Sequence, residues 1–168
     1  MRTLSLRHYA GIVFLGALIV ISSAWAFEVI GGYQPCALCL QQRIPYYVGV
    51  PLALIAVLLT FKPALQGLSR IALGLTALVF LISLFLAIRH AGVEWGWWLG
   101  ASNCGATNLD DFGQSGSLLD ELKDIKIVFC DEAAARFLGL SFAGWNAVAS
   151  LILAGIALKG SLSRPVSL

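Results

Sequence analysis

The sequence has few charged residues, only two histidines and a single methionine. Only 12% of its 168 residues are charged and 59% are hydrophobic, whereas soluble domains contain about 25% charged residues. This composition argues against a soluble domain and indicates one compact integral membrane unit covering residues 1–168. The few basic residues form no patch, so nucleic acid is not an expected partner.

Acidic residues are missing from three segments of the chain, and their absence predicts how the chain is oriented. Four apolar stretches, at residues 9–27, 44–61, 71–88 and 142–158, are long enough to cross a bilayer as helices. The segments before the first, between the second and third, and after the fourth stretch hold six of the eleven basic residues and no acidic one. All nine acidic residues lie in the links at 28–43 and 89–141. Because basic residues concentrate on the cytoplasmic side, we predict that both termini are cytoplasmic and that both links lie outside.

The N-terminal segment allows a second interpretation. Arg2, Arg7, the apolar run and the sequence Ala24-Trp25-Ala26 look like a signal peptide with an A-x-A cleavage site. The apolar run is long for a signal peptide, and a retained helix completes an even-numbered bundle, so we expect the segment to be kept. In either case the link at 28–43 faces the same side of the membrane.

All four cysteines fall in the two outer links, where disulfides can form and persist. Cys36 and Cys39 form a Cys-x-x-Cys pair, and Cys104 and Cys130 lie together in the long second link. A bridge within Cys-x-x-Cys closes a tiny loop and constrains the unfolded chain little, so thiol exchange explains this pair better than stability does. A bridge from Cys104 to Cys130 would stabilise the fold by about 3 kcal/mol in the chain-entropy model, so a structural role stays open for it.

The sequence around the Cys-x-x-Cys pair predicts a reactive thiolate. Pro35 suits the first turn of a helix, which would place Cys36 and Cys39 on one face of its first two turns. Unpaired N–H groups and the positive end of the helix dipole favour an anion there. Arg43 follows Cys39 by one helical turn, so we expect its cation to face that sulfur. Cys39 is therefore the predicted thiolate.

Two other roles of a Cys-x-x-Cys pair are disfavoured. Zinc would need further ligands, but Cys104 and Cys130 form no second knuckle, and neither His8 nor His90 clusters with the cysteines at ligand spacing. We therefore predict no metal. A thioredoxin fold would need βαβ patterning around the pair, and the flanking segments are membrane-length apolar runs instead.

The long link at 89–141 is predicted to rest on the membrane surface. Its tryptophans, Trp95, Trp97 and Trp98, favour the membrane–water interface. Residues 130–140 predict a short interfacial helix that ends at Gly139. His90 closes the third apolar helix and could either extend to the interface or serve a site.

The chain resembles the bacterial disulfide bond formation protein B family, DsbB. The resemblance rests on four helices over the whole length, on Pro-Cys-x-x-Cys-x-x-x-Arg at 35–43 and on a two-cysteine loop between the third and fourth helices. The run from Cys130 through Phe-Leu-Gly-Leu at 137–140 to Trp145 also resembles that family. The resemblance implies an all-α membrane protein, a four-transmembrane-helix bundle of the bacterial inner membrane. Its long periplasmic loop would carry the second cysteine pair.

The resemblance also implies a quinone-dependent thiol oxidase. The Cys104–Cys130 disulfide would accept electrons from a periplasmic thioredoxin-fold oxidase similar to DsbA, with Cys104 forming the mixed disulfide. Cys36 would then exchange with Cys130, and Cys39 would pass two electrons to the membrane quinone pool. Ubiquinone is expected in preference to menaquinone, although no residue discriminates their rings.

In the same resemblance Arg43 would stabilise a complex between the Cys39 thiolate and the quinone, and His90 would lie near the ring. Two alternatives stay open. One is a specialised paralogue that serves a single dedicated partner. The other is a non-catalytic membrane protein whose two disulfides only staple its outer loops.

Overall fold

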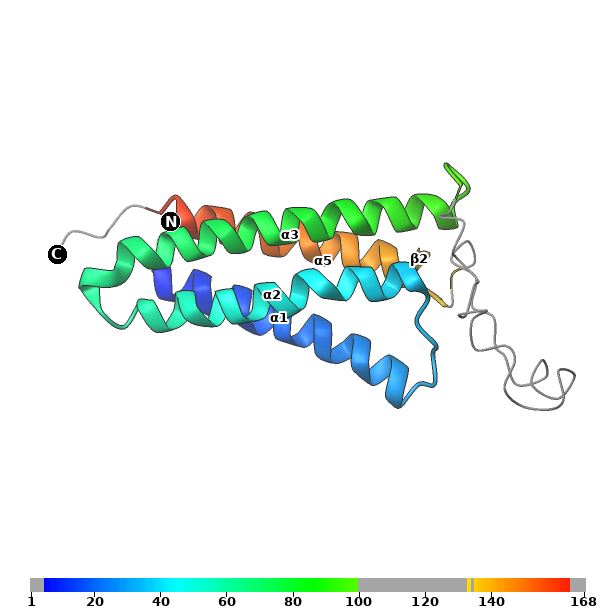
Figure 1. Cartoon of the computed structure of the whole chain (residues 1–168), viewed down its shortest axis with the longest axis horizontal. Helices are drawn as coiled ribbons and strands as arrows, with labels where there is room; N and C mark the ends of the chain where they lie inside the picture. Colours follow the sequence, from blue (N-terminus) through cyan, green and yellow to red (C-terminus); the bar gives the residue numbers. More distant parts are fainter. Residues whose placement is uncertain (1–4, 100–132, 134, 164–168) are drawn as a thin grey trace, which may run out of the picture.

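Four long helices lie side by side in the computed structural model, which describes residues 5–99, 133 and 135–163 (Figure 1). They are α1 (Leu6–Val29), α2 (Ala37–Leu59), α3 (Gln66–Glu94) and α5 (Phe142–Ser161), with the short 3-10 helix η1 (Pro63–Leu65) between α2 and α3. The start of α1 and the end of α5 lie at one end of the bundle. The α1–α2 connection and the end of α3 lie at the opposite end, which we call the site end (Figure 1).

Each of the four helices is long and apolar enough to span a membrane, as the sequence predicted. Large apolar side chains remain exposed on every helix, for example Ile19, Ile55, Phe85 and Ile152. Such a surface suits a hydrocarbon solvent, in which helices also satisfy their own backbone groups. The fold is thus a multi-pass helical membrane protein, and the predicted orientation of its termini stays a prediction.

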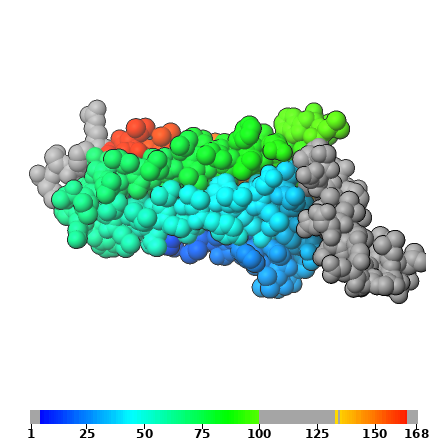
Figure 2. Space-filling model, viewed as in Figure 1, coloured from blue at the N-terminus to red at the C-terminus, as the bar shows by residue number. Residues whose placement is uncertain are grey.

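Small side chains line the contacts between the helices. Buried alanines come from all four helices, and they include Ala17, Ala53, Ala77 and Ala157. Small residues let helix backbones approach closely, which favours association where lipid removes the hydrophobic driving force. In the space-filling view α2 and α3 run in contact along one face of the bundle (Figure 2).

Most helix ends lie outside the predicted apolar stretches, although α2 ends at Leu59, two residues before its stretch does. Helix α2 begins at Ala37, ahead of the stretch at 44–61, and α3 covers 66–94 around the stretch at 71–88. Apolar runs mark only the part of a helix that matches the hydrocarbon layer. The polar turn Gln41-Gln42-Arg43 continues α2 because its backbone groups are still satisfied within the helix. The first outer link therefore shrinks to residues 30–36.

A β-hairpin precedes α5, where a short helix was predicted at 130–140. Strand β1 (Arg136–Phe137) pairs antiparallel with β2 (Leu140–Ser141). Leu138 and Gly139 between them have φ values of 51° and 84°. Two successive positive φ values suit a two-residue hairpin turn and are incompatible with a right-handed helix. The helix prediction is therefore wrong for residues 136–140, and residues 130–132 and 134 lie outside the described part of the chain.

Candidate active site

Cys36 caps the N-terminus of α2. Its backbone is extended (φ −74°, ψ 169°), and its sulfur accepts a hydrogen bond from the Cys39 N–H at 3.3 Å. The predicted helix start at Pro35 is therefore wrong, since the helix begins two residues later, at Ala37. The cap uses the Cys36 sulfur to satisfy one of the N–H groups that a helix leaves unpaired at its start.

The two cysteines of the pair lie very close together. Their Sγ atoms are 3.1 Å apart, with Cys36 buried and Cys39 half-buried, and no covalent bond joins these two sulfurs. Two thiolates bound to one tetrahedral zinc at about 2.3 Å would stand about 3.8 Å from each other. The sulfurs are closer than that, so their geometry suits a dithiol that is oxidised to a disulfide better than a zinc site. The predicted absence of a metal stays a prediction.

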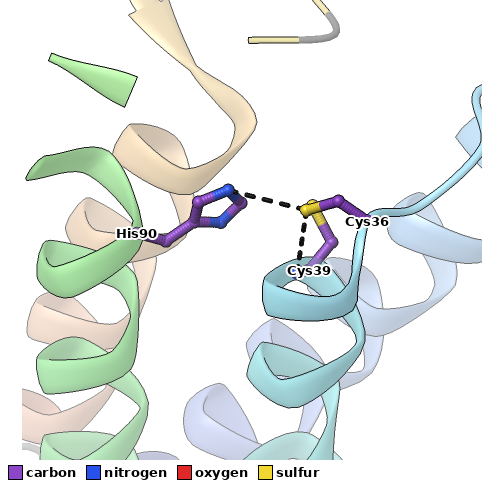
Figure 3. A group of neighbouring side chains, drawn as sticks. All are labelled: Cys36, Cys39 and His90. Carbon is purple, nitrogen blue, oxygen red and sulfur yellow. Dashed lines mark hydrogen bonds between the residues drawn. The ribbon is translucent and has the colours of Figure 1, made fainter. Parts of the chain in front are cut away.

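His90 of α3 faces this pair (Figure 3). Its Nε2 is 3.6 Å from Cys36 Sγ, and the donor atoms of His90, Cys36 and Cys39 all lie within 4.8 Å of one another. The prediction that no histidine clusters with the cysteines is therefore wrong for His90. That prediction considered spacing along one chain segment, whereas His90 comes from a different helix. At 3% exposure, the ring does not extend to the interface.

A chain of hydrogen bonds holds the His90 ring in place. Gln42 Nε2 lies 2.6 Å from His90 Nδ1. Asn146 Nδ2 donates to Gln42 Oε1 at 2.6 Å, and the Tyr46 hydroxyl donates to Asn146 Oδ1 at 2.7 Å. The chain thus ties α2, α3 and α5 together at the site end. Gln42 and Asn146 were not predicted as site residues, although polar residues within a membrane-spanning helix are a signal of function.

Arg43 is held by residues of α1. Its Nη1 donates to the Glu28 carboxylate, its Nη2 lies 3.5 Å from the Ala24 carbonyl oxygen, and its guanidinium lies 5.4 Å from the centre of the Trp25 ring. The predicted neighbour of Arg43 was Cys39 alone, and Glu28 was not predicted. An acidic residue at the end of an apolar run was the available signal.

A pocket of about 380 Å³ opens between α1, α2 and α5. Its wall is mostly apolar, and the rings of Phe27, Tyr33 and Phe142 pack together in it, with centroids 4.9 to 6.3 Å apart. Cys39 and Arg43 both line this pocket. An apolar cavity with a few convergent polar groups is typical of a ligand site. The third predicted cofactor-binding residue, His90, is not part of this wall.

The two thiols of the pair differ in environment. The hydrogen bond with Cys39 and then burial raise the pKa of Cys36 to about 12, while the hydrogen bond with His90 acts to lower it. The thiolate is the reactive form of a cysteine, so reduced Cys36 is a protonated, unreactive thiol at neutral pH. The assignment of the thiolate to Cys39 stays a prediction that this asymmetry supports.

Comparison with known proteins matches residues 6–159 to the family model described as disulfide bond formation protein DsbB. The chain belongs to the DsbB family. A protein named disulfide bond formation protein B from Saccharophagus degradans is 34% identical over 172 residues, which cover 95% of each chain. One of the same name from Acinetobacter baylyi is 31% identical over 90 residues, 54% of this chain and 52% of its own.

A further relative is an uncharacterised protein of Rickettsia prowazekii, 26% identical over 141 residues, which cover 82% of this chain and 77% of that one. No solved structure matches the chain. Membership of the DsbB family makes the protein an oxidoreductase of the disulfide-forming machinery, with a DsbA-like partner and the lipid bilayer around it. The second predicted pair, Cys104 and Cys130, lies outside the described residues.

Proposed function

We propose that this DsbB-family protein is a membrane thiol:quinone oxidoreductase that reoxidises a periplasmic DsbA-like dithiol oxidase. The observation that carries the proposal is the position of the cysteine pair. Cys36 caps α2 at the site end, and Cys39, one turn further, lines the apolar pocket that Arg43 also lines. The dithiol therefore lies at the start of α2, with Cys39 in the wall of a lipid-like cavity.

The pocket suits a quinone by its size and by the chemistry of its wall. Its volume of about 380 Å³ falls in the range of about 300–1,000 Å³ that ligand pockets occupy. Phe27 and Phe142 would contact the ring, while Arg43 and Gln42 offer N–H donors to its carbonyl oxygens. When bound, a quinone supplies an acceptor for two electrons and two protons. We expect ubiquinone in preference to menaquinone.

The cysteines then act in sequence. The Cys104–Cys130 disulfide oxidises the partner, with Cys104 forming the mixed disulfide. The Cys130 thiolate released in that reaction attacks the Cys36 sulfur, so the Cys36–Cys39 bond breaks and Cys39 leaves as a thiolate. The partner's second thiolate displaces Cys104 from the mixed disulfide, which leaves the partner oxidised and Cys104 as a thiolate. That Cys104 thiolate attacks Cys130, which restores the loop disulfide and releases Cys36 in its reduced form. The electrons gained from the partner thus reside in the Cys36–Cys39 dithiol, beside the pocket.

The protein environment favours this direction of transfer. Cys39 lies in the first turn of α2, where helix N–H groups stabilise an anion, and shares a pocket wall with the Arg43 guanidinium. A lower pKa makes a thiol a better leaving group, so Cys39 departs more readily than Cys36. We place the reaction at the periplasmic face of the inner membrane, with both termini cytoplasmic, because basic residues are concentrated in the segments at the other face.

Steady-state oxidation of a reduced DsbA-like dithiol tests the proposal. The purified full-length protein is assayed with a chelator, with and without a soluble ubiquinone analogue, while partner thiols and quinol are counted. We expect one quinol per dithiol oxidised and no turnover in Cys36→Ser, Cys39→Ser, Cys104→Ser or Cys130→Ser. A protein that uses its disulfides only as staples would show no quinone-dependent turnover in any form, and would lose stability in the Cys104→Ser variant.

A further inference from the structure

Glu94, the last residue of α3, is buried beside His90. Its side chain is 5% exposed, and its Oε1 lies 3.7 Å from His90 Nε2. Its other oxygen, Oε2, is buried with no hydrogen-bond partner among the described residues. A buried polar oxygen without a partner is costly, and a hydrogen-bond donor that reaches it removes that cost. Glu94 therefore presents one oxygen to His90 and a second that can accept a hydrogen.

His90 offers a single N–H group to two neighbouring side chains. Asn146 donates to the Gln42 oxygen, so the Gln42 amide presents its N–H group to His90 Nδ1. With Nδ1 as an acceptor, the neutral ring carries its proton on Nε2. That nitrogen is 3.6 Å from Cys36 Sγ and 3.7 Å from Glu94 Oε1. One N–H group between two acidic side chains can stabilise one negative charge at a time.

The neighbouring helices bring few other charges to this nitrogen. From α2 the further titratable group is Cys39, whose sulfur belongs to the same cluster of atoms. The described charges of α1 and α5 lie elsewhere, because Glu28 pairs with Arg43 in the pocket wall and the others lie toward the opposite end of the bundle. Cys36 and Glu94 therefore share one neighbour, the His90 ring.

We propose that Glu94 is the proton acceptor of Cys36, and that His90 donates its N–H hydrogen bond to whichever of the two carries the negative charge. This inference rests on the proposed function, in which the Cys36–Cys39 disulfide must re-form in every cycle. The proton of the Cys36 thiol passes to the Glu94 carboxylate through one water. At the same time the His90 N–H, which lies 3.6 Å from the sulfur and 3.7 Å from Glu94 Oε1, turns to the new Cys36 thiolate. No electron moves in this step, and the carboxyl later releases its proton to water.

The step answers a need that the site itself creates. A thiol with a pKa of about 12 ionises very little at neutral pH. Without a nearby base, Cys36 would lose its proton only to hydroxide, which is scarce at that pH. A base held close to the proton that it removes typically accelerates such a step by about 100-fold or more. Glu94 is not part of the pocket wall, so in this proposal it acts on Cys36 and not on the quinone.

The test compares Glu94→Gln, which keeps the shape but binds no extra proton, with Glu94→Asp, which restores the carboxylate. We expect Glu94→Gln to lower quinone-dependent turnover about 100-fold at pH 7 and to recover as the pH rises, because hydroxide replaces the missing base. Glu94→Asp should return most of the activity at pH 7. Arg89→Gln, at the same end of α3, serves as the matched control and should leave the pH profile unchanged.

A second readout needs neither quinone nor partner. In a chain with Cys39, Cys104 and Cys130 replaced by serine, the rate of Cys36 alkylation is followed against pH. Glu94→Gln should move the midpoint to lower pH, because the carboxylate no longer repels the thiolate or competes for the His90 N–H. An unchanged midpoint, or an equal loss of turnover at every pH, would overturn the inference. If the alkylation shift is found without quinone-dependent turnover, only the proposed function fails.

Discussion

The burial of the Arg43–Glu28 ion pair predicts how much stability the protein loses when either partner is replaced. The unequal exposure of the two side chains predicts which replacement costs more. The Arg43 side chain is 10% exposed and that of Glu28 is 29% exposed. Breaking a buried pair costs about 3–5 kcal/mol, whereas an exposed pair contributes about 0–1 kcal/mol. For this partly buried pair we expect the loss of one partner to cost about 2 kcal/mol, between those limits.

The two single variants should not be equivalent. Glu28→Gln leaves a guanidinium that is almost fully buried and unpaired, while Arg43→Gln leaves a carboxylate that water can still reach. We therefore expect Glu28→Gln to destabilise the protein more than Arg43→Gln. The double variant should lose less than the sum of the two, because it leaves no unpaired charge. Unfolding by denaturant in mixed micelles, with Arg89→Gln as the control, measures all three free energies.

The same variants separate stability from quinone binding. Arg43→Gln should raise the KM for the quinone analogue about 10-fold, the loss of one charged hydrogen-bond donor. Glu28→Gln keeps that donor, so its KM should change much less although its stability falls further. Equal KM increases in both variants, or a larger loss of stability in Arg43→Gln, would refute the reasoning from burial and charge.

Three further predictions concern other parts of the molecule. A Cβ on Gly92 would lie 2.1 Å from Trp98 Cζ2, so Gly92→Ala should displace the indole and break its hydrogen bond to the Arg89 carbonyl oxygen. We expect the fold to lose about 1–2 kcal/mol of stability, measured by tryptophan fluorescence and by unfolding. In the fully reduced protein at pH 8, alkylation should modify Cys39 before Cys36. The pKa of Cys36, about 12, keeps its thiol protonated until the pH approaches that value. Equal alkylation rates of the two cysteines, measured by peptide mass spectrometry, would contradict this prediction. A thiol reagent that cannot cross membranes should label Cys104 in intact cells after reduction, and labelling only after permeabilisation would show the opposite orientation.

The four helices could be predicted because bilayer thickness imposes a length on apolar runs. Their ends could not, because polar turns such as Gln41-Gln42-Arg43 continue a helix past the hydrocarbon layer without an apolar signal. The composition around residues 136–141 favoured a helix. In the structure Leu138 and Gly139 form a turn instead, and the Trp145 indole N–H donates to the Phe137 carbonyl oxygen at 2.9 Å.

The cysteine pair could be found from its motif, whereas its surroundings depend on which faces of separate helices meet. His90 lies 54 residues from Cys36 along the chain, and its contact depends on the rotation of α3 against α2. Glu94 follows His90 by one turn and joins the site for the same reason. Spacing within one segment predicted Arg43 beside Cys39, but the competing carboxylate of Glu28 comes from α1. Local patterns cannot show such partners.

The most direct test of the central claim isolates the dithiol that the structure describes. A protein with Cys104→Ser and Cys130→Ser retains only Cys36 and Cys39, and it is reduced, freed of reductant and mixed with a ubiquinone analogue under a chelator and without oxygen. The proposed function predicts that one quinol forms per protein as the two thiols are oxidised, and that Arg43→Gln slows this single turnover. Thiols that persist in the presence of excess quinone would contradict the claim that this pair delivers electrons to a ligand in the pocket.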